Sequence, residues 1–193
     1  MIRIPLILYF LGFLRSQNFP DFEVLHFENP HSSSLFLHTM SEQNRSMAII
    51  DSGLDVQWHV RSNHMGLDFK VNQNYLTYYN KIEGSWILAN QMMNEVDTLM
   101  CEGPYVADYH DIQILENGNY LLQAYDSSFV DMSTIIDGGQ SVVWITGILV
   151  IQMFDINHEL ISEWNAWDHL DISQYINLNL QSDAIEWMHG NSI

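Results

Sequence analysis

The chain has 193 residues, of which 47% are hydrophobic and 12% aromatic, enough to bury the core of one domain. Only six basic residues face 24 acidic ones, a formal net charge of −18, so nucleic acid and anionic membrane surfaces are poor partners on electrostatic grounds. Cys101 is the single cysteine, which excludes an internal disulfide and a zinc site built on cysteines.

The N-terminus has the pattern of a secretory signal. Arg3 precedes an uninterrupted apolar run from Ile4 to Leu14, which is too short to span a bilayer. We therefore expect residues 1–16 to be a signal peptide and the chain to be exported, to a periplasm or to the cell exterior. Cleavage after Ser16 would remove two arginines and no acid, so the net charge would become 4 − 24 = −20. The alternative is a buried N-terminal strand.

Strand signals dominate from about Ser34 onward, because β-branched and aromatic residues cluster or alternate between turn residues. Only Ile172–Leu180 indicates a short helix. The predicted strands are Leu35–Met40, Met47–Ile50, Val56–Val60, Asp68–Val71, Tyr75–Tyr79, Trp86–Ala89, Glu95–Met100, His110–Leu115, Asn119–Tyr125, Val142–Phe154 and Glu159–Trp164.

A faint repeat underlies these strands. Three times, an apolar pair leads into an Asp or Asn, a turn and a second apolar stretch, starting from Asp51, Asn90 and Asp155. Hairpins that recur every several tens of residues are typical of propeller blades. The sequence therefore predicts an all-β fold, a partial β-propeller of about three blades over residues 17–193. Asp183–His189 would open a fourth blade, at whose start the chain is interrupted.

Three polar residues are candidates for the functional site. His110 and His189 each open a predicted strand, and the innermost strand of a propeller blade lines the central channel, so both rings could face one ligand. Asn191 lies two residues after His189 and would share its strand face, where its amide could donate to an anionic oxygen. The alternatives are structural hydrogen bonding for the histidines and an ordinary turn for the asparagine.

The other histidines suggest no chemistry. Asp168-His169 looks like a carboxylate–imidazole pair, but adjacent residues of an extended chain face opposite ways. Trp164 and Trp167 beside them are expected to pack in the core or between blades. The remaining histidines lack metal-ligand spacing and are interpreted as surface or capping residues, so no metal ion or cofactor is expected. They are His26, His31, His38, His59, His64 and His158.

Four stretches together resemble bacterial arylsulfate sulfotransferases that work without the nucleotide sulfate donor. They are Gly66–Tyr79, Tyr109–Asp126, Val150–His169 and Ile185–Ile193. The resemblance implies a six-bladed, usually exported propeller that moves a sulfuryl group from a phenolic sulfate ester to another phenol through a sulfo-histidine. The turn after Val71 lacks the glycine that the resemblance leads us to expect.

By motif, the resemblance implies that His110 and His189 are catalytic and that Asn191 binds the sulfate. It places an active-site arginine and the nucleophilic histidine after residue 193, so the chain is expected to be an N-terminal fragment without turnover. Two alternatives remain open. One is a non-enzymatic propeller module for binding or scaffolding, as a homo-oligomer of paired half-propellers. The other is a different propeller enzyme, such as a metal-dependent hydrolase.

Overall fold

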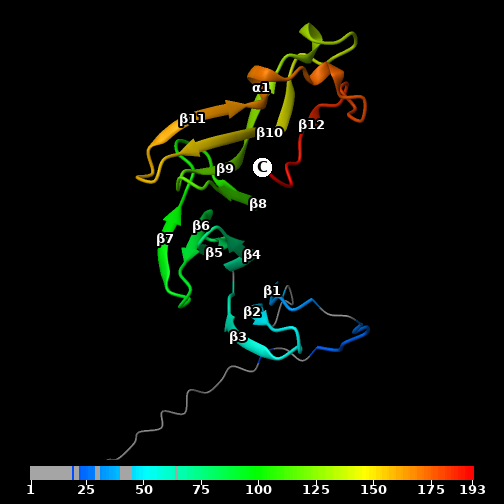
Figure 1. Cartoon of the computed structure of the whole chain (residues 1–193). Helices are drawn as coiled ribbons and strands as arrows, with labels where there is room; N and C mark the ends of the chain where they lie inside the picture. Colours follow the sequence, from blue (N-terminus) through cyan, green and yellow to red (C-terminus); the bar gives the residue numbers. More distant parts are fainter. Residues whose placement is uncertain (1–18, 20–21, 29–30, 40–44, 64) are drawn as a thin grey trace, which may run out of the picture.

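The computed structural model describes residues 19, 22–28, 31–39, 45–63 and 65–193, so the predicted signal peptide lies outside the described residues. Strands make up 48% of the structure and helices 6%, which confirms the all-β prediction. Three sheets follow one another in chain order, as Figure 1 shows. Within the described part of the chain, no helix is long and apolar enough to cross a membrane.

Each sheet is an antiparallel meander of strands consecutive in the chain, and the eleven strands predicted between Leu35 and Trp164 are confirmed. The first sheet contains β1 (Leu35–His38), β2 (Ser46–Ile50) and β3 (Val56–Arg61). The second contains β4 (Met65–Asn72), β5 (Tyr75–Asn80), β6 (Ser85–Ala89) and β7 (Glu95–Leu99). The third contains β8 (Ala107–Ile114), β9 (Tyr120–Val130), β10 (Val143–Phe154) and β11 (Leu160–Asn165), and the short β12 (Ala184–Glu186) pairs in parallel with β10.

The faint repeat corresponds to three hairpin turns with the same geometry, which join β2 to β3, β6 to β7 and β10 to β11. In each turn a side-chain oxygen accepts hydrogen bonds from the backbone N–H groups two and four residues later. The residue three positions later has a positive φ, as a three-residue hairpin loop with a bulge requires. The accepting residues are Asp51, Asn90 and Asp155, and the residues with positive φ are Leu54, Met93 and His158. Strands β1–β3 therefore correspond to β5–β7 and β9–β11.

Replacing the accepting residue of such a turn should loosen its hairpin. Asn90 Oδ1 accepts from Met92 N at 2.9 Å and from Asn94 N at 3.1 Å. We expect Asn90→Ala to lower the free energy of unfolding by about 1 kcal/mol. The backbone N–H groups of Met92 and Asn94 would lose the Asn90 oxygen and bond to water instead. Asn90→Asp keeps the oxygen and should stay within about 0.5 kcal/mol of the wild type. Urea denaturation followed by tryptophan fluorescence measures both; an equal loss in the two variants would contradict the role of the oxygen.

The second sheet is buried on both faces, which explains why β5 and β6 read as nearly continuous apolar runs. Side chains alternate between the faces, so Tyr78 and Ile87 pack towards the first sheet, while Tyr79 and Trp86 pack towards the third. The three sheets are thus stacked through two separate apolar layers, one on each side of the middle sheet.

A third apolar cluster lies at the far end of the third sheet, where β9 and β10 extend beyond their partners. It is covered by a 3₁₀ turn (Met132–Thr134), the four-residue helix α1 (Ala166–His169) and a second 3₁₀ turn (Ile172–Gln174). The predicted helix over Ile172–Leu180 is therefore wrong beyond its first turn. Ile172 is buried in the cluster, and Leu178 and Leu180 pack against it although residues two apart cannot share one face of a helix, while Ile176 is fully exposed.

The segment after β12 corrects a second expectation. Residues 187–193 form no strand, so His189 does not open one and Asn191 does not share a strand face with it. The backbone instead continues along β10, where Trp187 N donates to Thr146 O at 2.9 Å and Met188 N to Gly147 O at 3.1 Å. These contacts continue the parallel pairing of β12 with β10, and the start of a fourth blade at this point stays a prediction.

Candidate functional site

The candidate site lies on β4 and β8, the first strands of the second and third sheets, where both are bulged. Between Ala107 and Ile112, the register of β8 against β9 slips, so that five steps along β8 face two along β9. The register of β4 against β5 slips twice between Met65 and Lys70. Bulges release side chains from strict alternation, and in this case they allow several consecutive polar side chains of one strand to face the neighbouring sheet.

The start of β8 is held in place by two aromatic side chains of the second sheet. Tyr79 OH donates to Ala107 O at 2.6 Å, and Trp86 Nε1 donates to Asp108 O at 3.0 Å. Both rings are buried, and they pack edge to face with centroids 5.6 Å apart. Burial raises the pKa of Tyr79 to about 12, so its hydroxyl stays protonated and can donate this bond. The aromatic layer therefore sets the position of the residues that follow Asp108.

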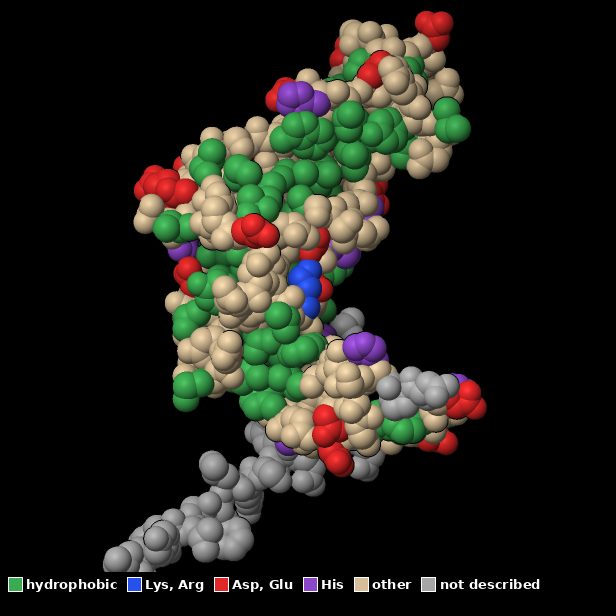
Figure 2. Space-filling view, in the orientation of Figure 1, with side chains coloured by type: hydrophobic (Ala, Val, Ile, Leu, Met, Phe, Trp, Pro, Cys, Tyr) green, Lys and Arg blue, Asp and Glu red, His purple; other side chains and the backbone are tan. Residues whose placement is uncertain are grey.

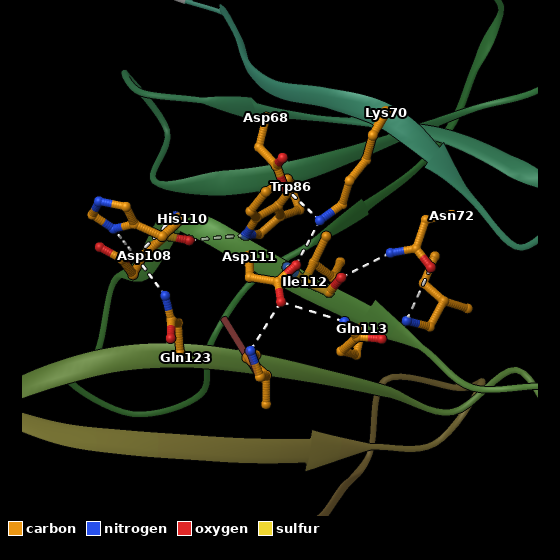
Figure 3. Close-up of polar contacts among 12 residues, drawn as sticks. Asp68, Lys70, Asn72, Trp86, Asp108, His110, Asp111, Ile112, Gln113 and Gln123 are labelled. Atoms are coloured by element: carbon orange, nitrogen blue, oxygen red, sulfur yellow. Dashed lines mark hydrogen bonds and ion pairs between the residues drawn. The ribbon is translucent and has the colours of Figure 1, made fainter. Parts of the chain in front are cut away.

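Asp108 and His110 form a carboxylate–imidazole pair that the sequence reading missed. His110 Nδ1 lies 2.7 Å from Asp108 Oδ1, and the same oxygen accepts from the His110 backbone N at 2.9 Å. Gln123 Nε2 on β9 donates to it as well, at 2.8 Å (Figure 3). An Asp two residues before a His was the available signal, because residues i and i+2 of a strand share a face. From the sequence, only the adjacent residues Asp168 and His169 were considered as a carboxylate–imidazole pair.

The structure brings His189 to His110. Their ring centroids are 4.7 Å apart in an edge-to-face arrangement, although one residue lies on β8 and the other in the segment after β12. Tyr109 stacks on His110, with ring centroids 4.1 Å apart. Asn191 and His189 are exposed, and neither donates to nor accepts from any described residue. The two imidazole rings are thus in contact with each other, whereas the Asn191 amide can meet solvent or a ligand.

A second polar group adjoins this pair. Lys70 Nζ on β4 forms ion pairs with Asp68 Oδ2, at 2.7 Å, and with Asp111 Oδ1 on β8 (Figure 3). The Ile193 backbone N donates to the other oxygen of Asp111 at 2.9 Å. Asn72 extends the contact by donating to Ile112 O at 2.8 Å. These bonds join the first strands of two sheets and the end of the 187–193 segment.

Two opposing effects set the pKa values of Asp68, Lys70 and Asp111, namely burial, which disfavours the charged form, and the bonds to charged or polar partners, which favour it. Burial opposes ionisation of Asp111, but the bonds from Lys70 and from the Ile193 N–H prevail and lower the pKa of this carboxyl. For Asp68, burial prevails over Lys70 and raises the pKa. Burial alone would lower the pKa of Lys70, yet its two carboxylate partners raise it. Lys70 therefore stays charged, and the carboxylates of Asp68 and Asp111 neutralise this charge.

The arrangement can hold and polarise an anionic oxygen chiefly through imidazole groups. Lys70 is neutralised by its ion pairs with Asp68 and Asp111, so it offers no free positive charge to an anion. Of the other residues singled out, His169 stacks on Trp164, with centroids 5.4 Å apart, and makes no bond with Asp168. Among the described residues, no group of three or more His, Cys, Asp or Glu side chains could hold a metal ion.

The remaining histidines lie apart from this site. His158 Nε2 pairs with Asp97 Oδ2 at 3.1 Å, between β7 and the β10–β11 turn, as a surface contact. His38 is half-buried with its Nε2 unpaired among the described residues, and burial lowers its pKa, which differs from the surface role expected. His64 lies outside the described residues.

Comparison with known protein families and with curated proteins gives no match for this chain.

Proposed function

We propose that the chain carries the sulfate-binding half of an arylsulfate sulfotransferase site, built from His110, His189 and Asn191. The observation that supports it best is the 4.7 Å approach of the two imidazoles from segments far apart in sequence. The two rings belong to His110 and His189, the residues that the sequence resemblance implies are catalytic. Two neighbouring imidazoles and an amide would together hold an anionic sulfuryl group.

The proposed architecture is a partial propeller, in which the three sheets are consecutive blades and β4 and β8 are inner strands. Three features support it: meanders of consecutive strands, the same turn between the last two strands of each sheet, and face-to-face stacking. The contact of β4 with β8 through Lys70, Asp111 and Asn72 is what converging inner strands would make.

Sulfuryl transfer would make specific demands on such a site. By analogy with phosphoryl transfer, the transition state is loose and its charge is spread over three equatorial oxygens. Positioned donors stabilise that charge, and losing one typically costs about a hundred- to a thousandfold in rate. Binding of the sulfuryl group is therefore the property that His110, His189 and Asn191 would supply and that can be tested on them.

Binding of an aryl sulfate tests the proposal. We expect 4-nitrophenyl sulfate to bind at the two imidazoles and the Asn191 amide, because Lys70 is already paired with Asp68 and Asp111. His110→Ala and His189→Ala should each weaken binding about tenfold, the value of one charge-assisted hydrogen bond. Titration calorimetry measures these affinities, and His158→Ala is the matched control, since that histidine pairs with Asp97 on the surface.

Two results would count against the site. One is the same affinity for 4-nitrophenyl sulfate in the wild type and both histidine variants. The other is an equal loss in the His158→Ala control, which would indicate a nonspecific charge effect. Binding of 4-nitrophenol as tightly as its sulfate ester would likewise show that the sulfuryl group is not what the site holds.

A non-enzymatic scaffold that pairs two copies is the second candidate. Leu35 and Leu37 on the edge strand β1 are 52% and 36% exposed, and hydrophobic side chains gather on the face shown in Figure 2. Unpaired edges and apolar surface favour association with another chain. Size-exclusion chromatography with light scattering should give a compact dimer if this candidate is right. A monomer, or heterogeneous aggregate, would reject it.

Export stays a proposal that rests on the apolar run between Arg3 and Ser16. Mass spectrometry of the N-terminus of protein recovered outside the cytoplasm would test it. An intact N-terminus on a protein retained inside the cell would contradict it.

A further inference from the structure

The environment of Asp108 suggests a role for this residue. Its Oδ1 accepts three hydrogen bonds, from the backbone N and the Nδ1 of His110 and from Gln123 Nε2, at 2.9, 2.7 and 2.8 Å. An ionised carboxylate can only accept. The Nδ1 atom must therefore carry a proton, and in neutral His110 the lone pair is on Nε2.

Gln123 extends this link to the segment that carries His189. Its side chain is 1% exposed, and its Nε2 donates both to Asp108 Oδ1 and to Gly190 O, the latter at 3.1 Å. Both partners are acceptors, which fixes the orientation of the buried amide. Tyr125 adds a second hold, because its hydroxyl accepts from Gly190 N at 2.6 Å.

Gly190 fits this hold because it has no side chain. A Cβ at this position would lie 2.8 Å from Gln123 Oε1 and 3.2 Å from Leu149 Cδ1. The backbone next to His189 therefore lies directly against the amide that also contacts Asp108. One buried side chain thus links the carboxylate behind His110 to the backbone beside His189.

We propose that Asp108 is the positioning residue of this site, which keeps a proton on Nδ1 of His110 so that Nε2 is the atom presented to the ligand, and that Gln123 couples this arrangement to His189. An anionic oxygen is met by Nε2 as a donor when that atom also carries a proton, and the Asp108–Nδ1–H bond is the same in both forms. The tautomer follows from the contacts alone, whereas the ligand it serves, a sulfuryl group, rests on the proposed function. Carboxylate partners of functional histidines commonly fix tautomer and ring orientation in this way.

Nuclear magnetic resonance of the ¹⁵N-histidine-labelled full chain tests the tautomer directly. At pH 8, long-range proton–nitrogen spectra should show Nδ1–H for His110. His158 contacts Asp97 through Nε2 and should show the opposite tautomer in the same spectrum. Asp108→Leu should remove the preference of His110, Asp108→Asn should retain it through the amide oxygen, and Asp97→Leu should change His158 only.

A second measurement separates the two proposals. Titration with 4-nitrophenyl sulfate should shift the His110 and His189 signals, and Asp108→Leu should weaken binding about tenfold, at the low end for a supporting partner. An Nε2–H tautomer of His110 in the wild type overturns the role of Asp108, and this result needs no variant to fold. The Nδ1–H tautomer without any response to the sulfate ester supports the positioning role and overturns the proposed ligand.

Discussion

Trp86→Ala is expected to be the most damaging single substitution in the described part of the chain. The Trp86 side chain is fully buried at 0% exposure, between the second and third sheets. Removing a buried tryptophan leaves a cavity as well as lost transfer free energy, which together cost about 3–5 kcal/mol. Against a typical total of 5–15 kcal/mol, this loss should leave a large unfolded fraction at modest urea concentrations. Urea denaturation followed by circular dichroism measures the loss.

Two controls separate the volume of Trp86 from its hydrogen bond. Trp86→Phe keeps most of the ring but removes the donor to Asp108 O, so it should cost about 1–2 kcal/mol and disturb the His110 signals. Trp167→Ala removes the same side chain where it is 37% exposed, and it should cost less, because less apolar area is buried there. Equal losses at the two tryptophans would show that the layer between the second and third sheets is not the main source of stability.

The strands could be predicted because local pattern and burial agree in them. The middle sheet is covered on both faces, so β5 and β6 carry nearly continuous apolar runs between clear turns. The start of β8 and the end of β9 were not predicted correctly from the sequence pattern. The strand β8 begins at Ala107, before the predicted His110, and β9 runs on to Val130, past the predicted Tyr125. These extra residues are mostly polar or exposed, and tertiary pairing, not pattern, holds them in the strands.

The site was predictable in part, for a related reason. His110 and His189 stand out by motif, and the structure places their rings together, while their catalytic roles stay predictions. Asp108 was missed because it lies before the predicted start of the strand at His110, although its spacing of two residues from His110 was a usable signal. The path of residues 187–193 could not be predicted from the sequence either. It depends on hydrogen bonds to β10, Tyr125 and Asp111, which lie far away in the chain.

Lys70→Met should be the second most damaging change, and its cost should depend on pH. At pH 7 the variant leaves Asp68 and Asp111 ionised without their shared cation, and the Asp111 side chain is only 7% exposed. Breaking a fully buried pair costs about 3–5 kcal/mol. Since the Lys70 side chain is 34% exposed, solvent screens part of this, and we expect about 2–3 kcal/mol. Lys81→Met, in the exposed turn between β5 and β6, should change stability by less than about 0.5 kcal/mol.

The pH dependence follows from the sign of the Asp111 shift. Its pKa is lowered in the folded protein, so its stabilising contribution is present above the ordinary aspartate pKa and is lost as pH falls through the lower folded value. Without Lys70, the pKa values of Asp111 and Asp68 should both rise, and protonation below about pH 5 would relieve their repulsion. The difference between Lys70→Met and the wild type should therefore shrink between pH 7 and pH 4.5, and adding Asp111→Asn should recover about 1 kcal/mol at pH 7. A difference that stays constant with pH would mean that Lys70 stabilises the β4–β8 contact by packing of its aliphatic chain, not by its charge.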